Sequence, residues 1–451
     1  MPLSRRTFLK GSALSTGAIG LLGSAVAAAN SGRFGEQLAG PACGTGNYGP
    51  LVKDPEGILD LPHGFSYKVL SRERAVMSDG NRVPALHDGM GAFHAGKDRV
   101  ALVRNHEMAP WQVEGGLVGA AHVEGSVYDF EAEAGGTTNL LVGPDRWLMK
   151  HYVSLAGTVN NCAGGVTPWN TWLTCEEDYT ILGKPHGYVF EVDPLGMGDP
   201  RPIRGMGRYE HEAVCFDRKG NAYLTEDDDG PHGCFYRFIP NKPLDGPGSL
   251  HGGGKLAALG VPGLDTDLSI VQTPGMVLKA AWIDVPNPDP GRWGTPVREQ
   301  VIDRGATPIQ KCEGCWTDLD GSIWFVSSRG DGKNQRREDR SVAAHSGQIW
   351  RYDPVAETIE LIVLFPVGTI YDRPDNIVAS PYGFAVACTD GIDDQWLLGI
   401  TQDGKVFPLG MNALNKRELA GATFSPDGKT LFANFQGPPG LTVAIEGPWQ
   451  G

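Results

Sequence analysis

The sequence predicts an all-β fold of the β-propeller class, and three observations support that prediction. The apolar segments are short and β-rich, and no long stretch shows helical periodicity. Glycine is abundant, with 63 residues among 451, as expected for a chain with many tight turns. A strand pattern recurs at a spacing typical of four-stranded propeller blades. A jelly-roll sandwich is the alternative fold, but it does not require such a repeat.

The recurring strand is an alternating apolar segment that usually ends in Asp-Pro or Pro. It occurs as GYVFEVDP, GCFYRFIP and GQIWRYDP, and more loosely as QWLLGITQDG, beginning at residues 187, 233, 347 and 395. The first two copies are 46 residues apart and the last two are 48 apart. Segments made of a turn and a strand accompany them: FDRKGNAYLT, TDLDGSIWFVSS, ASPYGFAVACT and FSPDGKTLFAN.

The second and third copies are separated by 114 residues, which is too many for two plain blades. A Pro- and Gly-rich span from about 241 to 298 accounts for the excess, and we interpret it as an insertion over one face. An ordinary surface excursion is the alternative. We therefore expect residues 30–451 to form a single propeller domain. Because blade loops converge on a central channel, residues distant in sequence can share one site there.

Residues 1–29 predict a targeting segment. SRRTFLK is a twin-arginine motif, and a Gly- and Ala-rich apolar stretch with small-residue cleavage options follows it. The stretch is short and interrupted by Gly and Ser, so we expect no stable membrane anchor. We expect the twin-arginine export machinery to deliver the folded protein to the periplasm or the medium.

The charge of the chain argues against nucleic acid as a partner. The formal net charge is −14 at pH 7, and the leader adds only basic residues, so the remainder is more acidic still. An acidic surface also repels phosphate. An anionic substrate would therefore need local positive charge, such as that of bound metal ions.

The most informative segment is NNCAGGVTPWNTWLTCEED, residues 160–178. It places Cys162 in a glycine-rich turn and ends an apolar strand with Glu176, Glu177 and Asp178. Adjacent carboxylates repel one another unless cations neutralise them. Carboxylates suit hard ions such as Ca²⁺, whereas a thiolate suits softer or higher-valent transition ions. The segment indicates a mixed metal centre, and a solvated acidic turn beside a structural cysteine is the alternative.

Five further segments place acidic residues beside an apolar strand. They are RNHE ending at residue 107, YEHE at 212, LTEDDD at 229, KCEG at 314 and DRPDN at 376. Six such segments, each next to a turn signal, are better explained by convergence on one pocket than by unrelated surface acids.

All eight cysteines follow the leader, and an oxidising compartment would permit disulfides. Cys312 and Cys315 form a lone CxxC, without the second pair or the histidines that a zinc site needs. We expect a local disulfide or two buried thiols there rather than redox catalysis.

The motifs NHE, GGTTN, NCAGG, TWLTCEE, GRYEHEA, YLTEDD, PDN and FSPDGKTLFAN, with the EG pair at 313–314 and the twin-arginine leader, resemble those of the PhoX-type alkaline phosphatases. The resemblance runs through most of the mature chain and is weakest in 241–300. It implies a β-propeller phosphatase that hydrolyses small phosphorylated substrates, phosphomonoesters, with an iron pair bridged to calcium ions.

Carried over residue by residue, the resemblance implies Cys162 as the iron thiolate ligand, with Glu212 and Glu313 as carboxylate ligands near the irons. Asn139 stands where the family offers an amide to the substrate phosphate. Lys311 stands where the family tends to have arginine, and lysine keeps the charge but loses the bidentate fork. Oxygen donors to iron or calcium are implied at Glu176, Glu177, Glu226, Asp227, Asp375 and Asn376.

Two other functions could use the same carboxylates. A calcium-dependent propeller hydrolase, such as a lactonase or phosphodiesterase, would leave Cys162 without a role. A calcium-stabilised binding propeller would turn over no phosphoester. Neither a G-x-S-x-G elbow nor a P-loop is visible. We expect His106 and His211 to be structural, with hydrogen bonding to a metal ligand or general acid catalysis as the alternatives. We expect three arginines to pair with neighbouring acids, with phosphate binding as the alternative: Arg104, Arg208 and Arg373.

Overall fold

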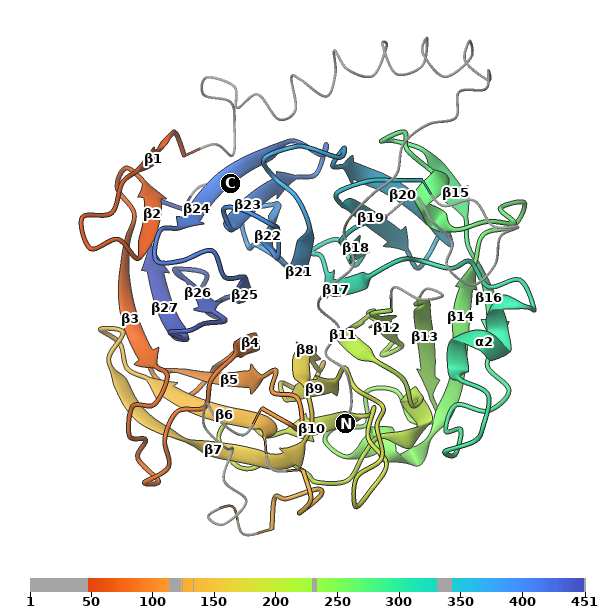
Figure 1. Ribbon diagram of the computed structural model, residues 1–451, viewed down its shortest axis with the longest axis horizontal. Coiled ribbons are helices and arrows are strands. Elements are labelled where there is room, and N and C mark those ends of the chain that lie inside the picture. Colours follow the sequence, from red (N-terminus) through yellow and green to blue (C-terminus); the bar gives the residue numbers. More distant parts are fainter. Residues whose placement is uncertain are drawn as a thin grey trace, which may run out of the picture. The chain divides into compact units, whose positions relative to one another are not determined.

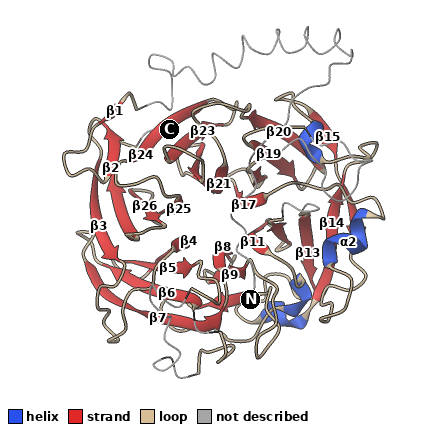
Figure 2. Cartoon of the chain, viewed as in Figure 1, coloured by secondary structure: helices blue, strands red, loops and turns tan. Residues whose placement is uncertain are grey.

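The computed structural model describes residues 48–112, 123, 125–132, 134–228, 233–330 and 343–449. The chain divides into two units, Met1–Pro41 and Ala42–Gly451, and every described residue belongs to the second. The leader expected at residues 1–29 lies outside the described residues. Strands dominate the described part (Figure 2), and none of its helices is long and apolar enough to cross a membrane.

Six β-sheets succeed one another around a common centre as propeller blades (Figure 1), which confirms the predicted fold class. Blade one contains β4 (His87–His94), β5 (Val100–His106), β6 (Gly135–Val142) and β7 (Leu148–Thr158), and blade two contains β8 (Asn161–Val166), β9 (Trp172–Glu176) and β10 (Val189–Val192). Blade three contains β11 (His211–Phe216), β12 (Ala222–Glu226), β13 (Phe235–Pro240), β14 (Gly254–Gly260) and β16 (Ala281–Asp284).

The other three blades follow the same plan. Blade four contains β17 (Cys312–Thr317), β18 (Ile323–Ser327), β19 (Gln348–Asp353), β20 (Thr358–Leu364) and β15 (Val277–Lys279). Blade five contains β21 (Pro374–Ala379), β22 (Phe384–Thr389), β23 (Trp396–Thr401), β24 (Val406–Asn412), β2 (Leu59–Pro62) and β1 (Leu51–Val52). Blade six contains β25 (Leu419–Phe424), β26 (Thr430–Phe435), β27 (Leu441–Glu446) and β3 (Ser66–Arg72).

The repeat seen in the sequence corresponds to fixed positions within the blades. Its apolar strand is the third strand of blades two to five, namely β10, β13, β19 and β23. The companion segments are second strands, namely β12, β18, β22 and β26. The spacing in the mid-forties therefore measures one blade.

The span from 241 to 298 contributes strands to two blades. It carries β14 and β16 at the outer edge of blade three, and β15, which pairs with β20 of blade four. Its helical turns are η3 (Ser249–Gly252) and η4 (Leu268–Ile270), and α2 (Val297–Ile302) begins at its end; η2 (Arg204–Met206) precedes the span. Much of the excess length is thus blade structure.

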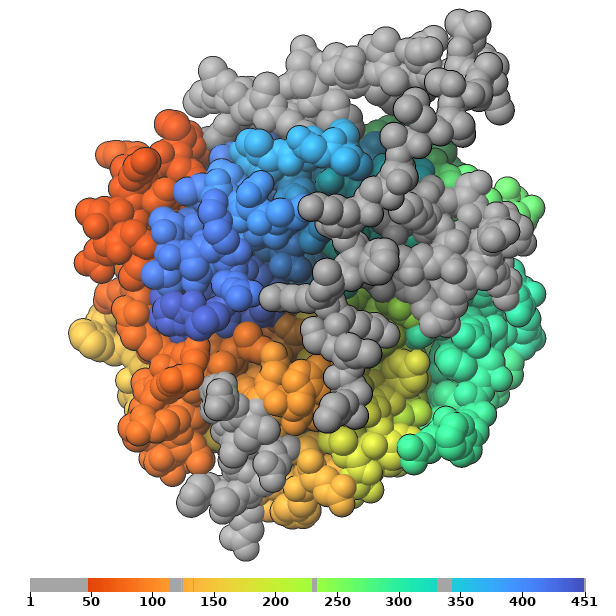
Figure 3. All heavy atoms as spheres, in the orientation of Figure 1, coloured from red at the N-terminus to blue at the C-terminus, as the bar shows by residue number. Residues whose placement is uncertain are grey.

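The ring closes where the two ends of the propeller pair. β3 joins β27 of blade six, with Leu441 opposite Arg72 and Glu446 opposite Ser66. In the space-filling view the early orange segment lies against the late blue one (Figure 3). This pairing covers the edge that a terminal strand would otherwise expose.

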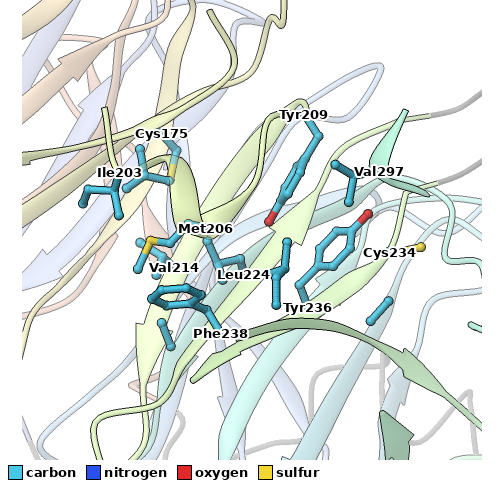
Figure 4. Close-up of a cluster of buried hydrophobic side chains, with 14 of the residues drawn as sticks. Cys175, Ile203, Met206, Tyr209, Val214, Leu224, Cys234, Tyr236, Phe238 and Val297 are labelled. Carbon is cyan, nitrogen blue, oxygen red and sulfur yellow. The ribbon is translucent and has the colours of Figure 1, made fainter. Parts of the chain in front are cut away.

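Apolar side chains fill the space between neighbouring blades. Leu173 and Val189 of blade two pack with Val214 and Leu224 of blade three, all fully buried. Figure 4 shows this cluster, which also holds several cysteines, tyrosines and the first residue of α2. Such packing fixes the inner strands and hence the side chains that they present to the centre.

Candidate metal centre

Every inner strand carries a β-bulge at the same place. The register shifts fall between His87 and Met90, Asn161 and Gly164, His211 and Val214, Cys312 and Cys315, Pro374 and Ile377, and Ala420 and Thr423. A bulge sets two residues against one and re-aims a side chain. The first residues of the six bulges form what we call the bulge ring: Asp88, Cys162, Glu212, Glu313, Asp375 and Gly421.

A second ring lies beside the first. It consists of the residue directly after the second strand of each blade, and we call it the strand-end ring: Glu107, Glu177, Asp227, Ser328, Asp390 and Gln436. The rings are in contact. Ser328 Oγ donates to Glu313 Oε1 at 2.8 Å, and Gln436 Nε2 donates to Asp88 Oδ2 at 2.9 Å and to Glu107 Oε2 at 2.7 Å.

The two rings bring the predicted ligand types together. In each of four triads the candidate ligand atoms lie within 4.8 Å of one another. Because neighbouring triads share members, they form one continuous cluster. The triads are Asp88–Glu107–Cys162, Cys162–Glu177–Glu212, Glu177–Asp227–Glu313 and Glu212–Glu313–Asp375.

The cluster holds many buried acidic groups close together, an arrangement that bound cations would stabilise. Burial, with neighbouring carboxylates adding to it, raises the pKa of the Cys162 thiol and of the Glu212 carboxyl well above their usual ranges, and the pKa of Glu313 to about 7. Glu212 Oε2 and Asp227 Oδ1 are buried without a hydrogen-bond partner among the described residues. Multivalent cations would let these groups ionise and satisfy those oxygens, so the donor set fits metal ions.

The sequence-predicted residues in this cluster are Cys162, Glu177, Glu212, Asp227, Glu313 and Asp375. Asn376 lies beside them, where its Nδ2 donates to Asp375 Oδ1 at 2.9 Å. Its Oδ1 accepts a hydrogen bond from the Gly421 backbone at 2.7 Å. The amide therefore supports Asp375, while its own oxygen is already engaged.

Lys311 supplies positive charge within the cluster. Its Nζ pairs with Asp227 and lies 3.2 Å from Glu313 Oε1. Burial disfavours its charged form, but Asp227, Glu313 and Glu177 outweigh that effect and raise the pKa of Lys311. The side chain is 26% exposed, so part of it reaches solvent.

Glu176 and Glu226 lie one residue before the strand-end ring, and their side chains are engaged elsewhere. Glu176 accepts hydrogen bonds from His186 Nδ1 at 2.7 Å and from the Gly187 backbone at 2.8 Å. Glu226 accepts from Arg298 Nη1 at 2.8 Å. Successive strand residues point to opposite faces, so only the following residue enters the channel. The structure does not bring these two predicted ligands into the cluster.

Asn139 also lies away from the cluster. It belongs to β6, the third strand of blade one, and its Nδ2 donates to the backbone oxygen of Asp193 at 2.9 Å. The structure therefore places the predicted phosphate amide between the outer parts of blades one and two.

The family comparison accords with this geometry. A family model described as alkaline phosphatase PhoX matches residues 46–150 and 137–439. The chain belongs to the PhoX alkaline phosphatase family. This membership supports a phosphatase, whereas a comparison with curated proteins finds no match.

A solved structure shows the same fold. PhoX from Pseudomonas fluorescens, in complex with the transition-state analogue vanadate, matches with a TM-score of 0.67 and 17% identity, over 89% of this chain and 97% of that one. Weaker similarities include a gluconolactonase from Xanthomonas campestris (TM-score 0.41, 12% identity, 90% and 100% coverage) and a virginiamycin B lyase from Staphylococcus aureus (TM-score 0.39, 11% identity, 84% and 99% coverage).

This PhoX-family centre includes acids that the sequence reasoning missed. Asp88 stands in HDG at 87–89, which parallels HEA at 211–213 and could have revealed it. Glu107 belongs to the NHE motif, but neither its position in the sequence nor the family resemblance marked it as a metal ligand. Burial raises the pKa of Asp390 and of Glu418, which precedes β25, and repulsion from cluster carboxylates adds to the rise: from Asp227 for Asp390, and from Asp88 and Asp375 for Glu418.

Two asparagines support the cluster from the backbone side. Asn105 Nδ2 donates to the backbone oxygens of Cys162 at 3.0 Å and Ala163 at 2.7 Å, which fixes the Cys162 bulge. Asn160 Nδ2 lies between Glu107, at 3.2 Å, and Glu177, at 2.9 Å.

The neighbouring histidines and arginines have structural partners. His106 contacts the Ala85 carbonyl and His211 the Gly207 carbonyl, and both rings are buried, in keeping with structural roles. Arg104 is fully buried and donates to Thr442 and other neutral groups, whereas Arg208 donates to backbone carbonyls. The expectation that these two arginines pair with acids is wrong within the described residues.

The CxxC cysteines form no disulfide. Cys312 and Cys315 are both free and buried, and each lies on β17 beside or near Glu313. Of the two alternatives that the sequence left open, the structure shows two buried thiols.

Proposed function

We propose that this PhoX-family protein is an exported phosphatase that hydrolyses phosphomonoesters at a mixed iron and calcium centre. One observation carries the proposal: a single thiol lies within a continuous, buried cluster of carboxylates at one end of the channel. Carboxylates alone would suit calcium, and the thiol adds a donor suited to a transition ion.

The residues divide by donor chemistry. Cys162, Glu212 and Glu313 would hold the transition ions, and the carboxylates around them would supply hard oxygen donors for calcium. When bound, such ions lower the pKa of coordinated water and neutralise charge on phosphoryl oxygens. Because the chain is acidic overall, this local positive charge would be what attracts a phosphate monoester.

Lys311 would bind a phosphoryl oxygen at the solvent side of the centre. Its ammonium is tied to Asp227 and Glu313, which holds it at the edge of the cluster. With metal ions neutralising those carboxylates, the ammonium would be available to an anionic substrate. A lysine offers a point charge, so we expect weaker orientation of the phosphoryl group than a bidentate arginine would give.

The alternative functions give Cys162 no role. A calcium-dependent lactonase or phosphodiesterase, or a binding propeller, needs only the oxygen donors. Yet the Cys162 sulfur belongs to two of the four ligand triads. This placement favours the mixed centre over a calcium-only site.

The test combines elemental analysis with turnover. Natively exported protein should contain iron and calcium and hydrolyse p-nitrophenyl phosphate, and Cys162→Ala should lose iron and activity together. Cys388→Ala is the matched control, because Cys388 is a buried free cysteine outside the ligand triads. An active, iron-free Cys162→Ala protein would overturn the iron assignment.

Export is tested separately. Replacing Arg5 and Arg6 with lysines should retain the precursor in the cytoplasm, as measured by fractionation. Unchanged export of that variant would contradict twin-arginine transport.

A further inference from the structure

A buried arginine sits behind one member of the strand-end ring. Arg298 belongs to the short helix α2, and its side chain is 4% exposed. Its Nη1 lies 2.8 Å from Glu226 Oε1 and 3.1 Å from Glu210 Oε2, and its Nη2 pairs with Asp228. One guanidinium thus serves three carboxylates.

Arg298 binds the residues on both sides of Asp227. Glu226 and Asp228 are the residues on either side of it, and the guanidinium binds both. The Tyr236 hydroxyl adds a second hydrogen bond to Glu226 at 2.5 Å. With its two neighbours held on the far side, Asp227 is directed toward Glu177, Glu313 and Lys311.

Removing the guanidinium would take the Arg298 counter-charge away from the buried Glu226 carboxylate. Glu226 is fully buried and Asp228 is only 12% exposed in its side chain. Breaking a buried ion pair by deleting one partner is strongly unfavourable, because the remaining charge is not compensated. The released side chains of Glu226 and Asp228 would be free to move or to attract another cation, and either response would disturb the position of Asp227 between them.

We propose that Arg298 is a positioning residue for the metal centre, which acts through Asp227. Its guanidinium pairs with Glu210, Glu226 and Asp228, so that these acids fix the chain on either side of Asp227 instead of competing for metal ions. The inference rests on the proposed metal centre. It also explains why Glu226, although next to a cluster member, is unavailable as a ligand.

The test is a double-mutant cycle on Ca²⁺ binding. Chelator-stripped wild-type protein, Arg298→Met, Asp227→Asn and the double variant are titrated with Ca²⁺ by calorimetry, with folding checked by circular dichroism. We expect Arg298→Met to weaken Ca²⁺ binding by about 10- to 100-fold, the range for residues that orient metal ligands. The double variant should bind about as weakly as Asp227→Asn alone, because both changes act on one ligand.

Two further variants keep the test decisive. Arg204→Met removes a half-exposed arginine that pairs with Asp289, and neither residue belongs to a ligand triad, so Ca²⁺ affinity should be unchanged. Arg298→Lys keeps one charge without the fork and should fall between wild type and Arg298→Met; it replaces Arg298→Met in the cycle if the latter does not fold. Additive losses in the double variant, or wild-type affinity in a folded Arg298 variant, would overturn this inference alone. Absence of Ca²⁺ binding by the wild type would overturn the metal centre as well.

Discussion

The two ends of the central channel are built from the same six inner strands, but the strands present different side chains at each end. At one end the bulge ring presents a thiol and carboxylates. At the other end the last two residues of these strands contribute apolar side chains to a cavity of about 520 Å³, which His94, Asp217 and Arg218 also line. The apolar residues are Phe93, Val166, Phe216, Trp316, Val378 and Phe424. On β11, Glu212 and Phe216 are only four residues apart.

The difference shows that position along the strand decides the chemistry. Each bulge lies at the beginning of its strand, and in every blade except the one with Gly421 it turns one side chain toward its counterparts from the other blades. Beyond the bulge, regular pairing resumes, and apolar residues at the ends of the strands line the cavity. The same inner strands can therefore carry charged ligands at their beginnings and pack as an ordinary propeller core along the rest of their length.

The largest effect is expected at the carboxylate end of β11. Glu212→Gln removes a charged donor that belongs to two ligand triads. We expect at least about a 100-fold loss of kcat/KM with p-nitrophenyl phosphate, together with lower metal content, because charge stabilisation by the ions would be lost. Near-wild-type turnover and metal content in a folded variant would remove Glu212 from the centre.

A second contrast uses adjacent residues. Glu177→Gln should reduce metal affinity by about 10- to 100-fold because a donor of two triads is changed. Glu176→Gln should chiefly lower the free energy of unfolding, by about 2 kcal/mol, because its carboxylate holds His186 and backbone amides instead. Calorimetric titration measures the metal affinity, and denaturant unfolding measures the stability. Equal loss of metal in both variants would contradict the conclusion that Glu176 and Glu177 point to opposite faces of the strand.

The apolar end of β11 should respond in stability alone. Phe216 is 6% exposed, and Phe216→Ala should lower the free energy of unfolding by about 3 kcal/mol. Metal content per folded molecule should stay at the wild-type value. Loss of bound metal at unchanged fold would mean that the two ends are not independent.

The smallest effect concerns His345, whose backbone pairs with Gly330 beside the carboxylate end. Burial lowers the pKa of His345 to about 3, against 6.5 for an ordinary histidine. Between those values the unfolded chain binds the extra proton, so stability falls as the pH drops below about 6.5. Relative to His345→Asn, wild type should lose roughly 2 kcal/mol more between pH 7 and pH 5 in denaturant unfolding; parallel pH curves would refute this.

The sequence revealed the blades and most of the ligand segments, because both repeat as short motifs. It located Cys162, Glu212 and Glu313 through the resemblance, and these residues begin the bulges of three strands. It could not separate Glu176 from Glu177, or Glu226 from Asp227. That distinction depends on where each strand ends, and a shift of one residue reverses the face to which a side chain points.

Other parts of the site required three-dimensional pairing. Asp88 lies more than 70 residues before Cys162, and only the arrangement of blades brings their ligand atoms within 4.8 Å. Arg298 comes from the region of weakest resemblance, and no motif marks it. Asn139 shows the opposite case, since its motif is present but its amide is bound to a backbone carbonyl between two blades.

The most direct test of the account is anomalous X-ray diffraction from crystals of the natively exported protein, measured at energies that distinguish iron from calcium. The account predicts an iron peak in coordination with Cys162 and calcium peaks among the carboxylates of the two rings. It predicts none beside Glu176 or Glu226. Crystals with no ion at the rings, or with ions bound by Glu176 and Glu226 instead, would contradict it.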